Sequence, residues 1–554
     1  MQESLKQGLT GYWQLQDDCL DRSGYGNHGK GHGADVSDGL FDGRSDFVEI
    51  SSSPTLNFGI GDFSLCAWVW TDKDIDDVIG DVLSKYDSKQ RKGWTLNIKS
   101  SSGGYNSCGD DRQVHFGIDD AIISDWQDCG RPSLTSNYVS NSLTVYDGNL
   151  YAGITDAEKE EDWCHVFRYL GGTDWHDCGR VGNLKARGVG PLIVHKGNLY
   201  SATWNYDWTR VGISRSGRPP YEADFCRVYR YADGTDWDNC GQPGFNKRLF
   251  SMASFRGNLY VVGDDKKCYV YEGGEDWRPC GEFPNYAHPM AVHDGRLFAG
   301  VLNPAGVHAF DGKNWKSLGN PYGSEERCNQ IHAMEVYQGR FYVTTWPEGM
   351  VAMLGDNEEW IDCGRLGDSI EINGLTVYNG KLYGGTIPRA EVFRYDGEKN
   401  WASIKRFLDP EGYEFRNSDE WARVTSLTVH DGRMFASMGS CTSSHLDAPC
   451  DFRGKVYSME AGKCVSFGRD IGSGWKHLTA VKRNDHLEIF IYGRKESVST
   501  IYDPNRFNLS NAQSLRIGLG EMDYFSGKIR EVRIYNRAIN DEEAKILAEK
   551  EPNR

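Results

Sequence analysis

Six residues in segments that precede short apolar runs have side chains that could take part in acid–base or electrostatic catalysis. They are Tyr286, His288, Glu326, Arg327, His332 and Glu371. An imidazole or a phenol can remove the proton beside a uronate carboxylate while an arginine, Arg327 or Arg248, neutralises the acid group. Glu326 and Glu371 could instead form the carboxyl pair that hydrolyses a glycosidic bond. We therefore predict a catalytic cluster with lyase or glycoside-hydrolase chemistry.

Arginines and aromatic residues are concentrated in the same segments of an otherwise acidic chain. The planar guanidinium group suits carboxylate and sulfate groups, and Trp and Tyr rings offer flat faces to sugar rings. The expected substrate-binding residues are Arg187, Trp204, Tyr206, Trp208, Arg248, Gln330, Trp346, Arg389 and Arg423. This mixture predicts an anionic glycan, uronate or sulfated, as the ligand.

These residues also have purely structural interpretations. Either histidine alone could hydrogen-bond the backbone in a central channel, whereas the two together favour a site. The histidines could also bind a transition metal with Gln330, but no matching ligand spacing is present, so we predict no metal there. Glu326 and Glu371 could be ion-pair partners of Arg327 and Arg389.

A repeated hairpin provides the elements that would hold these side chains. The stretch LTVYDGNLYAG (143–153) joins two alternating apolar runs through an Asp-Gly corner, which strongly indicates a hairpin. The motif occurs seven times, at intervals of 38 to 60 residues, with its corner glycines at Gly148, Gly197, Gly257, Gly295, Gly339, Gly380 and Gly432. A period of this size predicts an array of supersecondary units.

A second hairpin with a Trp-centred last strand follows the first, as in HVFRYLGGTDWHDCGR (165–180). Each unit then contains four antiparallel strands, and seven units predict a seven-bladed β-propeller. A solenoid is the alternative, but its helices or parallel rungs are not visible. We expect residues 122–131 to complete the blade built from 427–459, which closes the ring. The candidate site would lie on the upper face, among the connections between blades.

Three pairs of cysteines recur in register with the second hairpin: Cys164 with Cys178, Cys226 with Cys240, and Cys268 with Cys280. An antiparallel hairpin would place each pair nearly opposite, within bridging distance. We expect disulfides, and therefore an oxidising location that is secreted, periplasmic or at the cell surface. The start, MQESLKQGLTGYW, lacks the pattern of a signal peptide, so either the chain is cytosolic or a leader has already been removed. Alternatively, cysteine fills small buried spaces.

The two ends of the chain do not follow the repeat. A Tyr-Trp strand and DRSGYGNHG lie within 12–29, WKHLTAV covers 475–481, and FSGKIREVRIYNRA covers 525–538. These segments resemble the laminin-G-like, concanavalin A-like jelly roll of bacterial laminin-G-domain-containing proteins. The resemblance implies an all-β protein in which a jelly roll, residues 1–120 and 471–554, is split by an inserted seven-bladed propeller, residues 121–470. A short helix is expected over 541–550, with Asn540 as its N-cap.

The same resemblance allows a structural Ca²⁺ near Asp21 and the Gly-Asn turn, because carboxylate and carbonyl oxygens suit this ion. Many relatives carry Asp before the Glu-Val-Arg segment, where this chain has Arg530. No other cofactor is predicted.

Composition narrows the possible functions of the 554 residues. The formal net charge of −17 argues against a nucleic-acid partner, and no apolar run reaches the length of a membrane span. Motifs of phosphate-binding loops, nucleophile elbows and zinc proteases are absent. We favour a secreted carbohydrate-active enzyme that cleaves an acidic polysaccharide. The alternatives are a non-catalytic lectin or adhesin and a protein-interaction platform.

Overall fold

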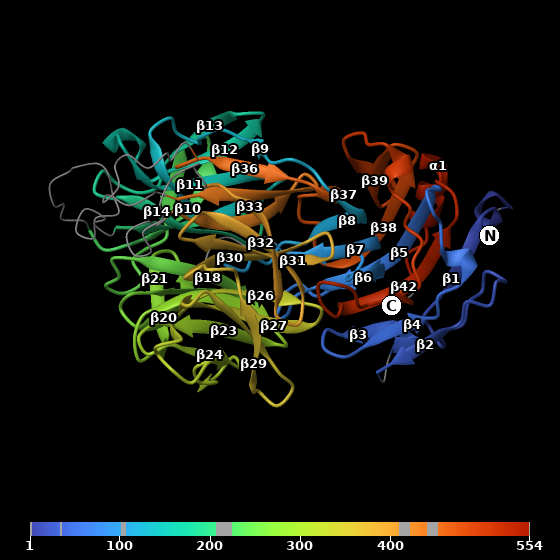
Figure 1. Cartoon of the computed structure of the whole chain (residues 1–554), viewed down its shortest axis with the longest axis horizontal. Coiled ribbons are helices and arrows are strands. Elements are labelled where there is room, and N and C mark those ends of the chain that lie inside the picture. Colours follow the sequence, from blue (N-terminus) through green and yellow to red (C-terminus); the bar gives the residue numbers. More distant parts are fainter. Residues whose placement is uncertain are drawn as a thin grey trace.

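The chain forms a ring of seven small β-sheets beside a sandwich of two larger sheets (Figure 1). This computed structural model describes residues 3–33, 36–100, 107–205, 224–408, 422–439 and 452–552. The middle of the chain makes the ring, and both ends of the chain make the sandwich. The predicted all-β class and the seven-bladed β-propeller are therefore confirmed.

Each blade is a four-stranded antiparallel sheet, ordered from the ring axis outward. Blades 1 and 2 consist of β10 (Ser136–Tyr146), β11 (Asn149–Ala157), β12 (His165–Gly171) and β13 (Asp174–Arg180), and of β14 (Gly188–His195), β15 (Asn198–Trp204), β16 (Val228–Asp233) and β17 (Asp236–Asn239). Blades 3 and 4 consist of β18 (Leu249–Phe255), β19 (Asn258–Gly263), β20 (Lys267–Gly273) and β21 (Asp276–Glu282), and of β22 (Ala287–His293), β23 (Arg296–Val301), β24 (Gly306–Phe310) and β25 (Trp315–Ser317). Blades 5 and 6 consist of β26 (Cys328–Tyr337), β27 (Arg340–Pro347), β28 (Met350–Leu354) and β29 (Trp360–Arg365), and of β30 (Glu371–Tyr378), β31 (Lys381–Ile387), β32 (Glu391–Gly397) and β33 (Asn400–Arg406).

The seventh blade closes the ring with a strand from the start of the propeller. It contains β34 (Val424–His430), β35 (Arg433–Met438) and β36 (Val456–Met459), and β36 pairs with β9 (Gln127–Asp128). The Cys129 N–H also donates to the carbonyl of Val456 at 2.9 Å. The innermost strands contact one another in order, and β34 contacts β10. The expected closure is confirmed, so the starts of all seven innermost strands share one axis.

The glycine corners of the repeated hairpin are tight turns of one type. At the first corner φ is 45° for Asp147 and 76° for Gly148, and at the sixth it is 43° for Asn379 and 79° for Gly380. Positive φ at both central residues defines the type I′ turn, whose twist matches that of the flanking strands. This turn chemistry fixes the register of the first two strands in each blade.

A repeated hydrogen bond joins neighbouring blades near their outer edges. The indole N–H of the Trp in a fourth strand donates to a carbonyl at the equivalent position of the preceding blade. The pairs are Trp175 with Cys129, Trp237 with Cys178, Trp277 with Cys240, Trp315 with Cys280, Trp360 with Leu318, and Trp401 with Cys363, at 2.7 to 3.1 Å. The blade tryptophans are therefore structural.

The expected disulfides are not found, because all thirteen cysteines among the described residues are free thiols. The strand register explains the difference for the first pair. The Cys164 carbonyl accepts a backbone hydrogen bond from Val181 at 2.7 Å, so Cys164 does not lie opposite Cys178. In the third pair Cys280 falls in a bulge, and the side chains of Cys268 and Cys280 contact each other as free thiols. These thiols fill small spaces between blades. The inference of an oxidising compartment depended on the disulfides, so the cysteines no longer support it.

The sandwich consists of two seven-stranded sheets. The first contains β1 (Leu9–Trp13), β42 (Ser526–Tyr535), β5 (Phe63–Thr71), β38 (Gly474–Arg483), β39 (His486–Ile491) and β40 (Arg494–Val498), with β3 (Leu40–Asp42) paired to β42. The second contains β2 (Gly29–His32), β4 (Phe47–Ile50), β41 (Leu515–Ile517), β6 (Gly80–Asp87), β7 (Lys92–Lys99), β8 (Gln113–Ile123) and β37 (Ala461–Phe467). The chain re-enters the sandwich at β37, directly after the last propeller strand.

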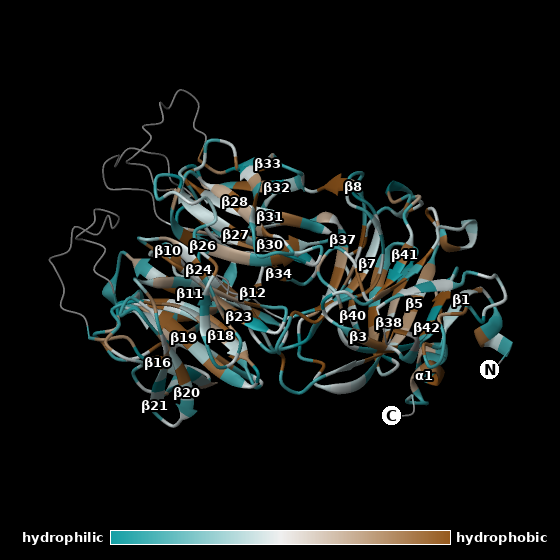
Figure 2. Cartoon of the chain, turned by 90° about the horizontal axis from the view of Figure 1, so that it is seen from below, coloured by the Kyte–Doolittle hydropathy of each residue, from teal (hydrophilic) through white to brown (hydrophobic). Residues whose placement is uncertain are grey.

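The sandwich core lies between the sheets and includes Trp13, Phe63, Trp94 and Phe116. Hydrophobic segments follow the strands of both bodies, whereas many loops are hydrophilic (Figure 2). The expected C-terminal helix is α1 (Asp541–Ala548), and the Asn540 side chain accepts a hydrogen bond from the Glu543 N–H in a capping box. None of the helices among the described residues is both long enough and apolar enough to cross a bilayer.

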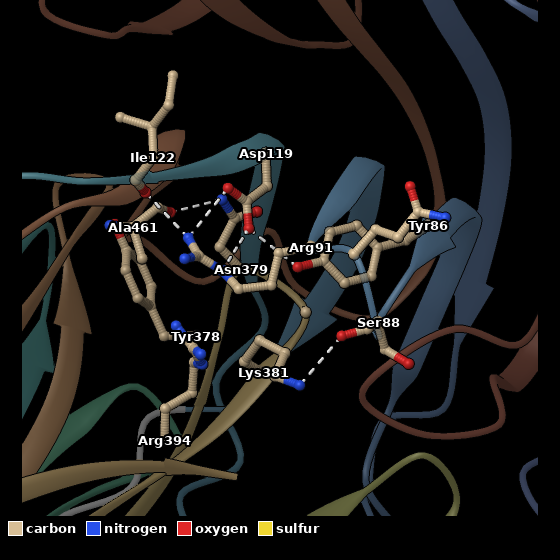
Figure 3. Close-up of polar contacts among 12 residues, drawn as sticks. Tyr86, Ser88, Arg91, Asp119, Ile122, Tyr378, Asn379, Lys381, Arg394 and Ala461 are labelled. Carbon is tan, nitrogen blue, oxygen red and sulfur yellow. Dashed lines mark hydrogen bonds and ion pairs between the residues drawn. The ribbon is translucent and has the colours of Figure 1, made fainter. Parts of the chain in front are cut away.

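The lower face of the propeller, where the seven corners lie, rests on the sandwich and its connections. Each corner contributes a polar contact, through Gly148, Lys196, Arg256, Asp294, Gln338, Asn379 and Gly432. The Asn379 amide, for example, donates to the carbonyls of Ile118 at 3.0 Å and Ala461 at 2.7 Å (Figure 3). The sandwich therefore covers the lower face, and a ligand of the ring is expected at the opposite, upper face.

Candidate functional site

Each innermost strand contributes one large polar side chain at its upper end. We call this set the upper cluster; its members are Tyr138, Arg187, Arg248, His288, His332, Glu371 and Arg423, one from each blade in order. All except Arg248 are buried, and Arg187 is fully buried. The ring thus brings together residues that are up to 285 positions apart in the sequence, as in the hydrogen bond between Tyr138 and Arg423.

Two imidazoles and one carboxylate form the centre of the upper cluster. The ring centroids of His288 and His332 are 5.2 Å apart in an edge-to-face arrangement. Nδ1 of His332 lies 3.3 Å from Oε1 of Glu371, and its Nε2 lies 2.9 Å from Oε1 of Gln330. The contacts at its two ring nitrogens fix the orientation of the His332 imidazole beside the Glu371 carboxylate.

Both histidines are held in their neutral form. Burial lowers the pKa of His288 well below its usual value, and the neighbouring His332 and Arg248 lower it further. Burial also lowers the pKa of His332, with a smaller opposing effect of the Glu371 carboxylate. A neutral imidazole can accept a proton, so both rings are in the form that a general base requires at pH 7.

The arginines of the upper cluster are each held by a polar partner. Nε of Arg248 lies 3.1 Å from Oδ2 of Asp264, and Nη2 of Arg187 lies 3.7 Å from Oδ1 of Asp156. Nη1 of Arg423 donates to the Tyr138 hydroxyl at 3.1 Å. These contacts fix three guanidinium groups of the upper cluster, of which Arg248 lies near His288 and Arg423 near His332. Fixed guanidinium groups are the pre-organisation that binding of a planar anion needs.

Aromatic rings extend the cluster on the side of blades 2 to 4. The Phe250 ring lies 3.9 Å from the His288 ring and 5.1 Å from Trp204, measured between centroids. The Arg248 guanidinium lies 5.3 Å from the ring centre of Tyr286. His288 therefore shares one group of contacts with Trp204, Arg248 and Tyr286.

The remaining predicted residues lie apart from this centre. Arg327 is exposed and pairs with Glu348 at 3.2 Å, and Glu326 is exposed on the segment before β26. Arg389 pairs with Asp368 at 2.9 Å, so the suggested pairs Glu326–Arg327 and Glu371–Arg389 are not the ones observed. Trp346 is half-buried on β27. Tyr206 and Trp208 lie outside the described residues.

Three members of the group were not among the sequence candidates. Asp156 and Asp264 hold arginines, and Phe250 packs against His288. Both aspartates stand at or just after the end of the second strand of their blades. An acidic residue at this repeat position, with arginine at the start of the next blade for Asp156 and of the same blade for Asp264, is the signal that could have revealed them.

The calcium site expected near Asp21 stays a prediction. The Asp21 carboxylate accepts hydrogen bonds from the N–H groups of Tyr12 at 3.0 Å, Ser23 at 2.8 Å and Asn27 at 2.9 Å. Arg530 pairs with Asp38 at 3.1 Å. Both Asp21 oxygens are therefore already used as acceptors, which is a poor fit to a calcium ligand.

The comparison with protein families identifies the sandwich. The sequence profile of the concanavalin A-like lectin/glucanases superfamily matches residues 420–545, which include β34 to β36 of the last blade, β37 to β42 of the sandwich and the start of α1. The protein thus combines a seven-bladed propeller with a concanavalin A-like domain, as the sequence predicted. No curated protein matches the chain.

Solved structures share the fold at low sequence identity. A virginiamycin B lyase from Staphylococcus aureus matches with a TM-score of 0.44 and 9% identity, over 61% of this chain and 99% of its own. YCF48 bound to D1 peptide gives 0.41 and 12%, over 61% and 98%, and the WD40 repeats of RRP9 give 0.41 and 12%, over 61% and 99%. These similarities concern the fold alone. A propeller with a concanavalin A-like domain is compatible with carbohydrate binding or with a protein-interaction platform.

Proposed function

We propose that the upper cluster binds an acidic saccharide, uronate or sulfated, and cleaves uronate-containing chains by β-elimination. The observation that carries the proposal is the 3.3 Å contact between His332 and Glu371, beside a second neutral imidazole and among three fixed arginines. Removal of a proton next to a uronate carboxylate requires a general base and a cation that neutralises this carboxylate. A histidine oriented by Glu371 and neighbouring arginines could supply both.

In the proposed reaction, His332 takes the proton from the carbon next to the uronate carboxylate, and Arg248 or Arg423 binds that carboxylate. The electron pair of the broken C–H bond forms a carbon–carbon double bond, and the bond to the leaving sugar oxygen breaks. That oxygen takes a proton from the Tyr286 hydroxyl. The imidazolium then returns its proton through water to the phenolate, so atoms and charges balance.

Hydrolysis has less support from the side-chain arrangement. It needs two carboxyl groups that flank one glycosidic bond. Glu371 is buried against His332, whereas Glu326 is exposed, and no contact joins them among the described residues. The two other carboxylates of the site, buried Asp156 and partly exposed Asp264, face arginines.

Glycan binding without cleavage is the second candidate. Three arginines of the upper cluster have fixed partners: Arg187 and Arg248 are ion-paired, and Arg423 is hydrogen-bonded. Fixed side chains favour a rigid glycan-binding surface as well as catalysis. A polysaccharide ligand of either kind would be met outside the cytoplasm. The proposal therefore includes a secreted, periplasmic or cell-surface location.

A panel of acidic polysaccharides tests the proposal. Cleavage that yields both a new ultraviolet absorbance and new reducing ends indicates a lyase, and reducing ends alone indicate a hydrolase. His332→Gln should lower kcat about 10²–10⁴-fold, the usual contribution of a general base, and Glu371→Gln should also lower it. His308→Gln, on the third strand of blade 4, is the control. Binding of a polysaccharide without cleavage would support the lectin function instead. Unchanged turnover in the His332→Gln variant would contradict the role of His332 as the general base.

A further inference from the structure

Asp77, His293 and Asp523 meet where the propeller rests on the sandwich. His293 is the last residue of β22, Asp77 lies between β5 and β6, and Asp523 lies between β41 and β42. One potential ligand atom from each residue lies within 4.8 Å of the other two. The three residues come from parts of the chain that only the docking of the two bodies brings together.

The separations in this group suit a shared cation better than direct hydrogen bonds. Nδ1 of His293 lies 3.4 Å from Oδ2 of Asp523 and 3.8 Å from Oδ1 of Asp77. A direct N–H···O hydrogen bond spans about 2.7–3.2 Å. Two ligands bound tetrahedrally to one Zn²⁺, each at about 2.1 Å, lie about 3.4 Å apart.

Two of the atoms that face one another, on His293 and Asp523, lack a partner at hydrogen-bond distance. Asp523 is fully buried, yet neither its Oδ2 nor Nδ1 of His293 forms a hydrogen bond with any described residue. The other carboxylate contacts hold the groups in place. Oδ1 of Asp523 accepts the Tyr524 N–H at 2.8 Å, and Oδ1 of Asp77 accepts the Asp294 N–H at 2.7 Å. Such outer contacts are what orients metal ligands.

Charge also favours a cation. Two carboxylates, those of Asp77 and Asp523, face the single imidazole of His293. One imidazole nitrogen and two carboxylate oxygens suit a divalent transition-metal ion such as Zn²⁺ or Mn²⁺.

The equivalent histidine of blade 2 shows what distinguishes this position. His195 also ends an innermost strand and faces an aspartate, Asp110, at 3.3 Å. Its Nδ1, however, forms a 2.8 Å hydrogen bond with the Ser254 hydroxyl, and Asp110 also accepts from that hydroxyl. A single carboxylate and a hydroxyl satisfy His195, whereas His293 faces two carboxylates and no hydroxyl.

A polar cleft of about 350 Å³ extends from the outside to His293, one member of the group. His293, Arg44, Arg340 and Tyr524 are among the residues that line it. It offers an access route for an ion and space for water molecules to complete the coordination, both of which a metal site requires.

We propose that a divalent transition-metal ion binds Asp77, His293 and Asp523 and fastens the propeller to the sandwich. The competing explanation is an imidazolium ion that bridges the two aspartates without metal. This site lies on the lower face, so its test is independent of the proposed activity of the upper cluster.

Metal binding by the full-length protein, stripped with a chelator, decides between the two explanations. We expect titration with Zn²⁺ alone to give one tight site in the wild type and in His195→Gln, the matched control. His293→Gln and Asp523→Asn should lose that site and the accompanying rise in Tm. Mn²⁺ and Ca²⁺ titrations establish the metal preference. A wild type that binds no more Zn²⁺ than His293→Gln would overturn the proposal and favour the imidazolium.

A second measurement covers variants that fail to fold. Crystals of the wild type soaked in Zn²⁺ should show an anomalous difference peak between the three side chains. A peak there supports the site even without the variants. Soaked crystals that show no peak at this position overturn the proposal.

Discussion

Replacement of Arg91 by methionine tests the buried ion pair that lies under the sixth blade. Nε and Nη2 of Arg91 lie 3.0 and 3.1 Å from the two oxygens of Asp119, and Nη2 also donates to the Ile122 carbonyl at 2.9 Å (Figure 3). Both side chains are buried, at 5% and 1% exposure. Methionine keeps the apolar stem but leaves Asp119 without its cation, which costs about 3–5 kcal/mol for a buried pair.

The cost should depend on pH, because Asp119 can take up a proton. Burial raises the pKa of Asp119 from 3.8 to about 6 even beside Arg91. A carboxyl whose folded pKa is raised contributes stability below its unfolded pKa and loses it as pH rises through the folded value. For a shift of 2.2 units, from 3.8 to about 6, this amounts to about 3 kcal/mol between pH 4 and pH 6. Without Arg91 the pKa rises further, so protonation at pH 5 should remove more than half of the penalty seen at pH 8.

Urea unfolding of four proteins measures this effect: wild type, Arg91→Met, Asp119→Asn and the double variant. Midpoints at pH 5 and pH 8, followed by tryptophan fluorescence, give the cost of Arg91→Met in each background. In the Asp119→Asn background no carboxylate is left unpaired, so the cost should be smaller and independent of pH. An equal cost at both pH values, or in both backgrounds, would refute the reasoning.

Three further predictions concern the corners, the thiols and the histidines. Gly380→Ala should destabilise the protein by about 1–3 kcal/mol more than Gly197→Ala, because both positions have positive φ but only at Gly380 would the new Cβ lie 2.5 Å from the Tyr86 ring; equal unfolding midpoints would contradict this. Alkylation under denaturing conditions without reductant should modify all thirteen described cysteines, and mass spectrometry that shows any of the three repeat pairs unmodified would restore the disulfides. Since the pKa values of His288 and His332 are lowered, kcat/KM should stay level as pH falls from 8 to 6.5 and decline only below, whereas a midpoint above 7 would contradict neutral imidazoles.

The features that the sequence predicted well depend on short-range chemistry. The Asp147–Gly148 corner, the strand alternation around it and the helix cap at Asn540 are all set within a few residues. The count of seven blades and the closure through β9 follow from the number of repeats and the unpaired motif at 124–132. The internal repeat of a single sequence is therefore enough to predict the number of blades and the way the ring closes.

The features that the sequence did not predict depend on contacts between blades or on the exact register of paired strands. Asp156 comes from blade 1, and nothing local links it to Arg187 of blade 2, whereas Asp264 faces Arg248 across the hairpin of blade 3. The first cysteine pair fails because the register places Cys164 beside Val181 rather than Cys178. Glu326 and Arg327 stand in the right segment of the sequence, but both are exposed there.

The hairpin corner explains why a site for a ligand larger than an ion is expected on the upper face. A type I′ turn needs residues that adopt positive φ, and it leaves backbone N–H groups pointing away from the blade. Here the sandwich accepts several of these donors: Gly148 donates to Gly468 at 2.9 Å, and Gln338 donates to Glu521 at 3.1 Å. The same seven turns that define the blades are thus used to dock the sandwich, which leaves the upper face to larger ligands. The upper ends of the innermost strands carry no such constraint, and there each blade can place a different side chain around the axis. The separation of a uniform lower face from a varied upper face is why a repetitive chain can hold imidazole, carboxylate and guanidinium groups together in a single cluster.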